Sequence, residues 1–126
     1  MMTLPPYAAL IGATLEWEDD APVLAMPFAD AVLGRPGFLH GGAIAGLMEM
    51  AAIAALRHAL ADENARIKPV NVTVDFMRGG RDKVTRAAGI VTRLGNRVAN
   101  VEAIAWQDER ARPIAAARMN YLLARE

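Results

Sequence analysis

One stretch of this sequence decides its fold: FLHGGAIAGLMEMAAIAAL, residues 38–56. A glycine pair opens a long apolar run, so we expect an α-helix from Gly41 or Gly42 to about Leu60. The only charged side chain within the run is that of Glu49. The apolar part is 16 residues long, whereas a membrane-spanning helix needs about 20. The stretch therefore predicts the buried core helix of a protein that does not enter a membrane.

The expected helix is apolar on nearly all sides, so it has no face suited to water. A single sheet covers one side of a helix without enclosing it, and a monomer rarely exposes so large an apolar surface. The zero net charge permits association, because the chain lacks strong self-repulsion. We therefore expect a sheet on one side of the helix and a second subunit on the other, which makes a homodimer.

The rest of the chain is typical of strands separated by turn residues. Val70, Val72, Val74 and Phe76 alternate with polar residues, which predicts a strand with one buried face. We expect strands over residues 11–18 and 23–28 before the helix, and over 70–76, 84–93, 98–107 and 113–123 after it. Short turns between the last four strands favour an antiparallel meander, because parallel strands need long crossovers. The prediction is one α+β domain over residues 1–126, in the order β-β-α-β-β-β-β.

The composition excludes several classes of protein. The 126 residues include 14 Lys and Arg and 14 Asp and Glu, so the chain lacks the basic excess of a nucleic-acid-binding protein. The absence of Cys excludes disulfide scaffolds, zinc-thiolate sites and cysteine nucleophiles, and suits a reducing cytosol. Two distant His residues without clustered acids predict no metal site. The N-terminus lacks the segments of a signal peptide, so we expect a cytoplasmic protein.

Glu49 is the residue that does not fit the apolar helix. Burial of an unpaired carboxylate is costly and raises its pKa unless something compensates. A carboxylate in such a place is a candidate general base or nucleophile. The alternative is a structural Glu that pairs with an Arg across a dimer interface or faces a hydrated seam.

Gly41 and Gly42 form a second candidate feature. The first N–H groups of a helix have no intrahelical partner, and the helix dipole favours negative charge beside them. Because glycines lack side chains, a ligand oxygen can approach these amides, as an oxyanion hole requires. A glycine pair also serves turn geometry alone. We expect His40 to be structural, with its ring bonded to the irregular segment before it, and His58 to interact with the helix dipole.

Basic and sulfur-containing side chains offer possible substrate contacts. Five basic residues lie at predicted turns and strand ends: Arg78, Arg81, Lys83, Arg93 and Arg97. They are either solvated or hold a phosphorylated ligand, since Arg matches phosphate geometry. Internal methionines such as Met48 either line an apolar tunnel or fill the core.

Three motifs together resemble a known family. The run over residues 38–49 resembles the hotdog-fold acyl-CoA thioesterases of the phenylacetate-pathway (PaaI-like) type, which have His-Gly-Gly and then Asp or Glu nine positions after the His. The sequence Phe76-Met77-Arg78 is similar to the family's aromatic-x-Arg strand motif. Residues 93–97, RLGNR, are similar to its basic glycine turn. The chain departs from the family at Gly34, where many members have Asn, and at Gly79, where many have Pro.

The resemblance implies a hotdog fold, in which a curved antiparallel sheet wraps a long central helix, and assembly into dimers and often into dimers of dimers. It implies that Glu49 is the catalytic carboxylate and that the Gly41 N–H polarises the thioester carbonyl. The expected catalytic residues are Glu49, Gly41, Gly42 and His40, and the expected substrate contacts are Gly34, Met48, Phe76, Arg78, Arg81, Arg93, Asn96 and Arg97.

The expected activity is hydrolysis of a small or medium acyl-CoA or aryl-acyl-CoA to free acid and coenzyme A. No metal or redox cofactor is expected, because coenzyme A is part of the substrate. The alternatives are a non-catalytic acyl-CoA-binding hotdog domain and a hotdog hydratase or dehydratase. Arg35, five residues before His40, is not the Asp that the hydratase motif expects.

The spacing of the two main candidate groups predicts a shared site. Gly41 and Glu49 are eight residues apart, which is about 12 Å along one helix. An oxyanion donor and an attacking group must both lie about 3 Å from one carbonyl group. Antiparallel packing of two helices in a dimer would bring Gly41 of one chain beside Glu49 of the other, twice by symmetry.

Overall fold

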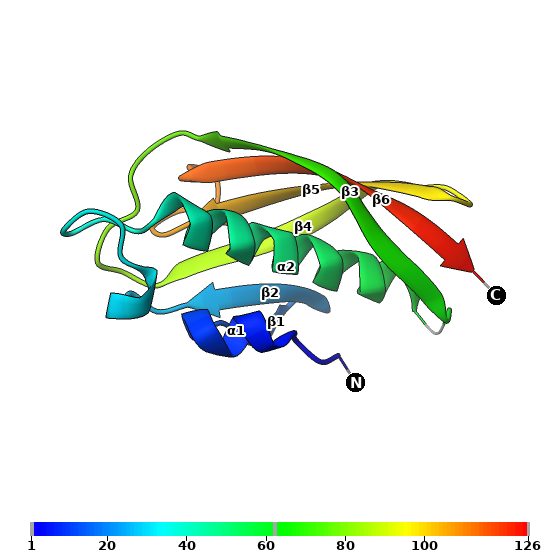
Figure 1. The fold of residues 1–126 in the computed structure, drawn as a ribbon, viewed down its shortest axis with the longest axis horizontal. Coiled ribbons are helices and arrows are strands. Elements are labelled where there is room, and N and C mark those ends of the chain that lie inside the picture. Colours follow the sequence, from blue (N-terminus) through cyan, green and yellow to red (C-terminus); the bar gives the residue numbers. More distant parts are fainter. Residues whose placement is uncertain (1, 62, 126) are drawn as a thin grey trace.

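The computed structural model describes residues 2–61 and 63–125 (Figure 1). The helices are α1 (Pro6–Ile11) and α2 (Gly41–Leu60), with a short 3-10 turn, η1 (Asp30–Val32). The strands are β1 (Thr14–Glu18), β2 (Ala21–Met26), β3 (Ala65–Phe76), β4 (Thr85–Leu94), β5 (Val98–Trp106) and β6 (Ala115–Arg125).

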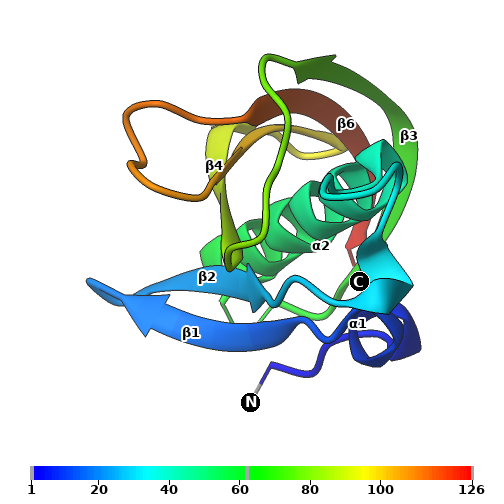
Figure 2. The same cartoon turned by 90° about the vertical axis from the view of Figure 1, so that its left-hand side faces the viewer.

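The strands form one antiparallel sheet that curves around α2 (Figures 1 and 2). The order of its six strands is β1-β2-β4-β5-β6-β3. Helix α2 lies on the concave face, where its contacts are mainly with β4, β5 and β2. The structure confirms the predicted α+β class and the hotdog arrangement of a long helix wrapped by an antiparallel sheet.

Helix α2 is buried because small residues let the sheet approach it. A Cβ atom added at Gly89 of β4 would lie 2.8 Å from the Ala52 Cα atom, so only glycine permits this separation of helix and sheet. Leu47, Met48 and Leu56 have no exposed surface. Among the described residues, α2 is the helix long and apolar enough to cross a membrane, but 56% of its most apolar window is buried inside the protein, as in a core helix.

The N-terminal region differs from the predicted pair of strands. Residues 6–11 form α1, which the sequence analysis did not anticipate; Pro6 occupies its first position, where a missing N–H costs nothing, and Gly12 ends it with a φ of 71°. The predicted hairpin is confirmed over shorter strands, β1 and β2. Its turn residues Asp19 and Asp20 both have positive φ, which gives the tight hairpin turn that Asp tolerates.

The predicted meander of four strands is wrong at its first strand. Strands β4, β5 and β6 are consecutive neighbours, but β3 pairs with β6 at the far side of the sheet. Strand β4 pairs with β2 instead, so the chain crosses the end of the fold through residues 77–84. The connection over residues 77–84 is longer than a tight hairpin turn, so β3 and β4 need not pair with each other. Strand β4 pairs instead with the edge of β2 that β1 leaves open.

Strand β3 is longer than predicted and is an edge strand. The prediction that one face of this strand is buried is wrong for a single chain, because Val70 and Phe76 are each 56% exposed and Val72 is 44% exposed. The reason is that α2 covers the middle of the sheet and scarcely touches β3. A twelve-residue edge with exposed apolar side chains is a surface that proteins normally cover.

Candidate functional site

The first turn of α2 is held by His40. This residue is the N-cap, with extended backbone, and its Nδ1 atom accepts a hydrogen bond from the Gly42 N–H at 2.8 Å. The prediction of a structural histidine agrees with this geometry, although its partner is the helix and not the segment before it. The Gly42 N–H is therefore occupied, and the expectation that Gly42 supplies a second oxyanion donor is wrong for this arrangement.

The Gly41 N–H is the remaining candidate donor. It makes no hydrogen bond to any of the described residues. A Cβ atom added at Gly41 would lie 3.3 Å from Cζ of Phe76, so the Phe76 ring packs directly against the glycine. Gly34 lies behind the same turn, since a Cβ atom there would be 3.0 Å from the His40 Cα atom. The structure thus brings Gly34, His40, Gly41 and Phe76 together, and their catalytic and substrate-binding roles stay predictions.

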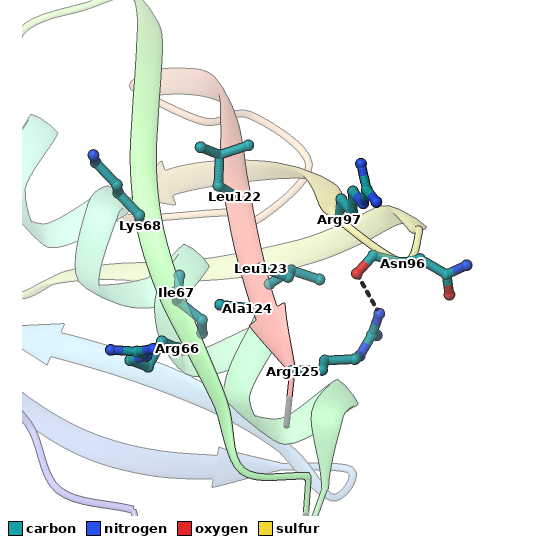
Figure 3. Close-up of a pocket in the computed structure, with 9 residues that line it drawn as sticks. All are labelled: Arg66, Ile67, Lys68, Asn96, Arg97, Leu122, Leu123, Ala124 and Arg125. Carbon is teal, nitrogen blue, oxygen red and sulfur yellow. Dashed lines mark hydrogen bonds between the residues drawn. The ribbon is translucent and has the colours of Figure 1, made fainter.

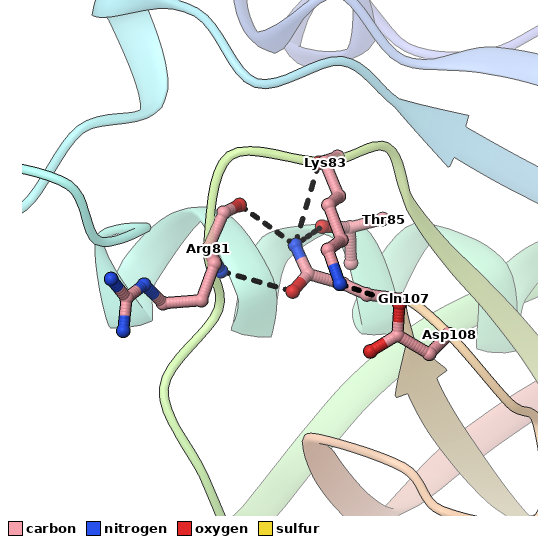
Figure 4. Close-up of polar contacts among 5 residues, drawn as sticks. All are labelled: Arg81, Lys83, Thr85, Gln107 and Asp108. Atoms are coloured by element: carbon pink, nitrogen blue, oxygen red, sulfur yellow. Dashed lines mark hydrogen bonds and ion pairs between the residues drawn. The ribbon is translucent and has the colours of Figure 1, made fainter.

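The loop over residues 77–84 supports this end of α2. The Leu39 N–H donates to the Gly80 carbonyl at 3.0 Å. Gln107 ties the loop to the end of β5 (Figure 4): its side chain accepts from the Arg81 N–H and donates to the Arg81 carbonyl, both at 2.9 Å. It also donates to Thr85 Oγ1 at 3.1 Å. Sequence reasoning missed Gln107, because a single polar residue at a strand end carries no periodic signal.

Two arginines stack on one aromatic ring beside this loop. The guanidinium carbons of Arg35 and Arg81 lie 4.2 and 4.4 Å from the Phe38 ring centroid, which are cation–π distances. Arg81 was predicted to contact substrate, whereas Arg35 was not. The stack places two positive charges near the N-terminus of α2. Arg78 is exposed in the same loop.

Glu49 lies in the middle of α2 and is partly buried. It forms no ion pair with the described residues of its own chain. The Glu49 charge affects Tyr121 of β6: burial of the phenol and the negative charge of Glu49 together raise the pKa of Tyr121. Gly46, Glu49 and Ile53 are spaced by three or four residues on the side of α2 that the sheet leaves partly uncovered.

The Met48 side chain lies in the core and not on the partly uncovered side of α2. It has no exposed surface and belongs to the main hydrophobic core, so the prediction that it contacts substrate is not supported by the geometry. Its neighbour Glu49 differs because a helix rotates each successive residue onto another face.

Of the other predicted basic residues, Arg97 borders a hollow at the opposite end of the sheet (Figure 3), whereas Lys83 pairs with Asp108 at 2.7 Å. The hollow has a volume of about 860 Å³ and includes the predicted Asn96 and Arg97 together with Arg66 and Lys68 of β3. Figure 3 shows Arg66 and Lys68 on one side of β6 and Arg97 on the other, so the charges are spread along the rim. Sequence reasoning missed Arg66 and Lys68, because β3 begins five residues before the predicted strand.

Arg125 shapes the turn beside the hollow. Its Nε atom donates to Glu63 at 2.8 Å, and its Nη1 atom donates to the carbonyl oxygens of Gly95 and Asn96 at 2.8 Å. By contrast, Arg66, Lys68 and Arg97 form no ion pair with the described residues. The hollow therefore has uncommitted positive charges.

The predicted arginines separate into two groups. Arg78 and Arg81 precede β4, whereas Arg93 and Arg97 lie at its other end, and ten residues of strand correspond to about 30 Å. One phosphate group cannot contact both groups of a single chain. Within the part of the chain that the structure describes, no three His, Asp or Glu residues are grouped as a metal site would require.

Residues 36–114 match the family model of the thioesterase superfamily, which is more than half of the 126 residues. The chain belongs to the thioesterase superfamily. The matched range includes the α2 N-terminus, Glu49 and both arginine groups. No curated protein matches this superfamily member.

Solved structures share the fold of this thioesterase-superfamily chain. A Chromobacterium violaceum protein is 34% identical, with a TM-score of 0.75, and the match covers 94% of this chain and 83% of the other. A phenylacetic acid degradation-related protein from Ralstonia eutropha JMP134 is 22% identical, with a TM-score of 0.78 and coverage of 96% and 92%. A Bacillus halodurans protein crystallised with CoA is 18% identical, with a TM-score of 0.85 and coverage of 97% and 80%.

A structural His40 predicts a specific pattern of substitution. His40→Ala removes the cap of the Gly42 N–H and should lower the free energy of unfolding by about 0.5–2 kcal/mol. His40→Asn keeps a side-chain acceptor and should retain most of the stability, measured by urea denaturation. It should also retain thioesterase activity. Equal inactivation of both variants, with both folded, would instead indicate that the imidazole takes part in catalysis.

Proposed function

We propose that this chain is an acyl-CoA thioesterase whose active sites are shared between the two subunits of a homodimer. The observation that carries the proposal is a pair of groups on α2, the Gly41 N–H and the Glu49 carboxylate, that have no partner among the described residues of this thioesterase-superfamily member. The first suits an oxyanion and the second suits activation of water or direct attack.

The dimer follows from the separation of these groups. Eight helical residues hold them about 12 Å apart, and the Gly41 N–H points off the end of α2 while Glu49 lies on its flank. A second copy packed with its α2 antiparallel would supply the missing partner to each site. Two surfaces support this assembly: the partly uncovered side of α2 and the exposed apolar edge strand β3.

The reaction adds water across the thioester. In one route Glu49 takes a proton from water as the water oxygen bonds to the carbonyl carbon, and the Gly41 N–H of the partner stabilises the resulting oxyanion. The oxyanion then re-forms the carbonyl, the C–S bond breaks, and the sulfur of coenzyme A leaves with its electron pair and receives a proton. The products are the free acid and coenzyme A, and no metal or redox cofactor is needed.

In the second route Glu49 acts as the nucleophile. Its carboxylate oxygen bonds to the carbonyl carbon and expels the coenzyme A sulfur, which leaves a mixed anhydride on Glu49. Water then hydrolyses the anhydride, which restores Glu49 and releases the acid. Phe76 would line the thioester in both routes, since its ring rests against Gly41.

Spread positive charge suits coenzyme A, which carries phosphates at two positions. The hollow near the β4–β5 turn offers Arg66, Lys68 and Arg97 without acidic partners among the described residues. We propose that it holds the phosphates, whereas Arg81 is already engaged with Phe38. The CoA in the Bacillus halodurans structure supports a CoA ligand for this fold.

A non-catalytic acyl-CoA-binding domain is the second candidate. Gly34 favours it, because this residue offers no side chain at the position where the resemblance to PaaI-like thioesterases leads us to expect Asn, and the 3.0 Å approach to His40 leaves little room for one. Calorimetric titration with acyl-CoA beside a thiol-release assay separates the two functions. Binding without thiol release would establish this second candidate.

Glu49→Gln tests the catalytic assignment. It preserves shape but removes both the base and the nucleophile, so turnover should fall by about 10²–10⁴-fold. The fold should persist or gain stability, because a partly buried charge is removed. Thiol release from acyl-CoA and urea denaturation are the measurements. Retention of more than half of the wild-type rate would contradict the role of Glu49.

The phosphate assignment predicts a change in KM rather than in kcat. Lys68→Ala and Arg97→Ala should each raise KM for acyl-CoA with little effect on kcat, as loss of uniform binding requires. The difference from wild type should shrink at high salt, because exposed charges are screened beyond about 10 Å at 0.1 M. Arg112→Ala, an exposed arginine of the β5–β6 loop, is the control. A rise in KM for Arg81→Ala alone would place the phosphates at the loop over residues 77–84.

A further inference from the structure

A second cavity lies beside α2, on the side opposite β3. It is a hollow that opens to solvent, with a volume of about 780 Å³, and it is bordered by residues 2–5, by Trp17 of β1 and by the second half of α2. Met50, Ile53 and His58 are among the α2 residues that line it. Neither the motifs nor the proposed mechanism uses this cavity.

The lining of the cavity is mainly apolar, and the guanidinium of Arg57 at its edge has a backbone partner. Trp17 is 52% exposed, and its indole meets the His58 imidazole edge to face with ring centroids 5.5 Å apart. Arg57 donates from Nη1 to the Ala65 carbonyl at 2.6 Å. Met50 and Ile53 supply the α2 wall, and a methionine adapts its shape to a ligand. An exposed indole that faces aliphatic side chains suits an apolar ligand.

The cavity begins one helical turn from Glu49. Ile53 follows Glu49 by four residues, so the two side chains are neighbours on the partly uncovered side of α2, about 6 Å apart along the axis. Met50 adjoins them toward Trp17. A thioester whose carbonyl lies at Glu49 can therefore extend its acyl group past Ile53 and into the cavity without crossing the sheet.

We propose that this cavity is the acyl-specificity pocket and that Trp17 and Ile53 determine which acyl groups are accepted. The inference rests on the proposed function. The apolar lining favours an uncharged aliphatic or aromatic acyl group, and 780 Å³ is far more space than an acetyl group fills. The enzyme should consequently prefer medium-length or aromatic acyl groups over short ones.

The test compares acetyl-CoA with octanoyl-CoA. Trp17→Ala removes the outer wall, and Ile53→Phe narrows the entrance next to Glu49. Each should lower kcat/KM for octanoyl-CoA by about tenfold or more, the scale of one or two methylene contacts, and leave kcat/KM for acetyl-CoA unchanged. Leu10→Ala, which shortens a 69% exposed side chain of α1 outside the cavity, should change neither value. Equal losses of kcat/KM for both substrates, or no loss for octanoyl-CoA, would contradict the assignment of this cavity as the acyl-specificity pocket.

A binding measurement separates this inference from the proposed function. The S-octyl thioether of CoA cannot be hydrolysed, and its insertion should shift the emission of Trp17 to the blue, whereas the S-ethyl thioether should not. The shift should vanish in Trp17→Phe. If the wild type hydrolyses no acyl-CoA but shows this shift, the proposed activity is wrong and the pocket stands. If it hydrolyses octanoyl-CoA without any shift, the pocket is wrong and the activity stands. A partner segment seated in the cavity would also prevent the shift and overturn the pocket.

Discussion

The stiffness of α2 is the constraint on which the rest of this structure depends. Eight residues of helix separate the Gly41 N–H from Glu49, and an α-helix cannot shorten that separation without breaking its hydrogen bonds. The sheet buries the helix along most of its length, so neither group can move toward the other. Two groups suited to one carbonyl are thus held apart in a single chain. The partly covered side of α2, on which Tyr7 packs at Gly46, and the β3 edge provide the surfaces on which a second chain can unite them.

At the N-terminus of α2, the Gly42 N–H has an acceptor within the chain, whereas the Gly41 N–H is left available to a ligand. His40 takes the Gly42 N–H, which leaves the Gly41 N–H as the donor without a partner among the described residues. Gly80 accepts from Leu39, and Gln107 clamps the neighbouring Arg81 backbone, so the loop after β3 supports the residues just before the helix. Phe76 then closes the space beside Gly41. Preorganisation of this kind is what an oxyanion site requires.

Much of this could be predicted from local patterns, and the failures have physical reasons. The long apolar run and its glycine start predicted α2 correctly, and the lone carboxylate at Glu49 stays the predicted catalytic group. Strand pairing was not predictable, because β3 and β4 are adjacent in sequence but pair with β6 and β2. Helix α1 was missed because six residues are too few for a clear helical period, although Pro6 is favoured at a first helical position. Gln107, Arg66 and Lys68 became candidates only through tertiary contacts, which no local spacing reveals.

The most direct test of the account is complementation between two inactive variants. Gly41→Pro deletes the N–H at a helix position that tolerates proline, and the extended His40 before it is compatible with a following proline. Glu49→Ala deletes the carboxylate. Each homodimer should be inactive, whereas co-refolded variants should recover up to about a quarter of wild-type activity, because half of the dimers are mixed and each mixed dimer has one intact site. No recovery from a verified population of mixed dimers would show that both groups act from the same chain and would contradict the shared site.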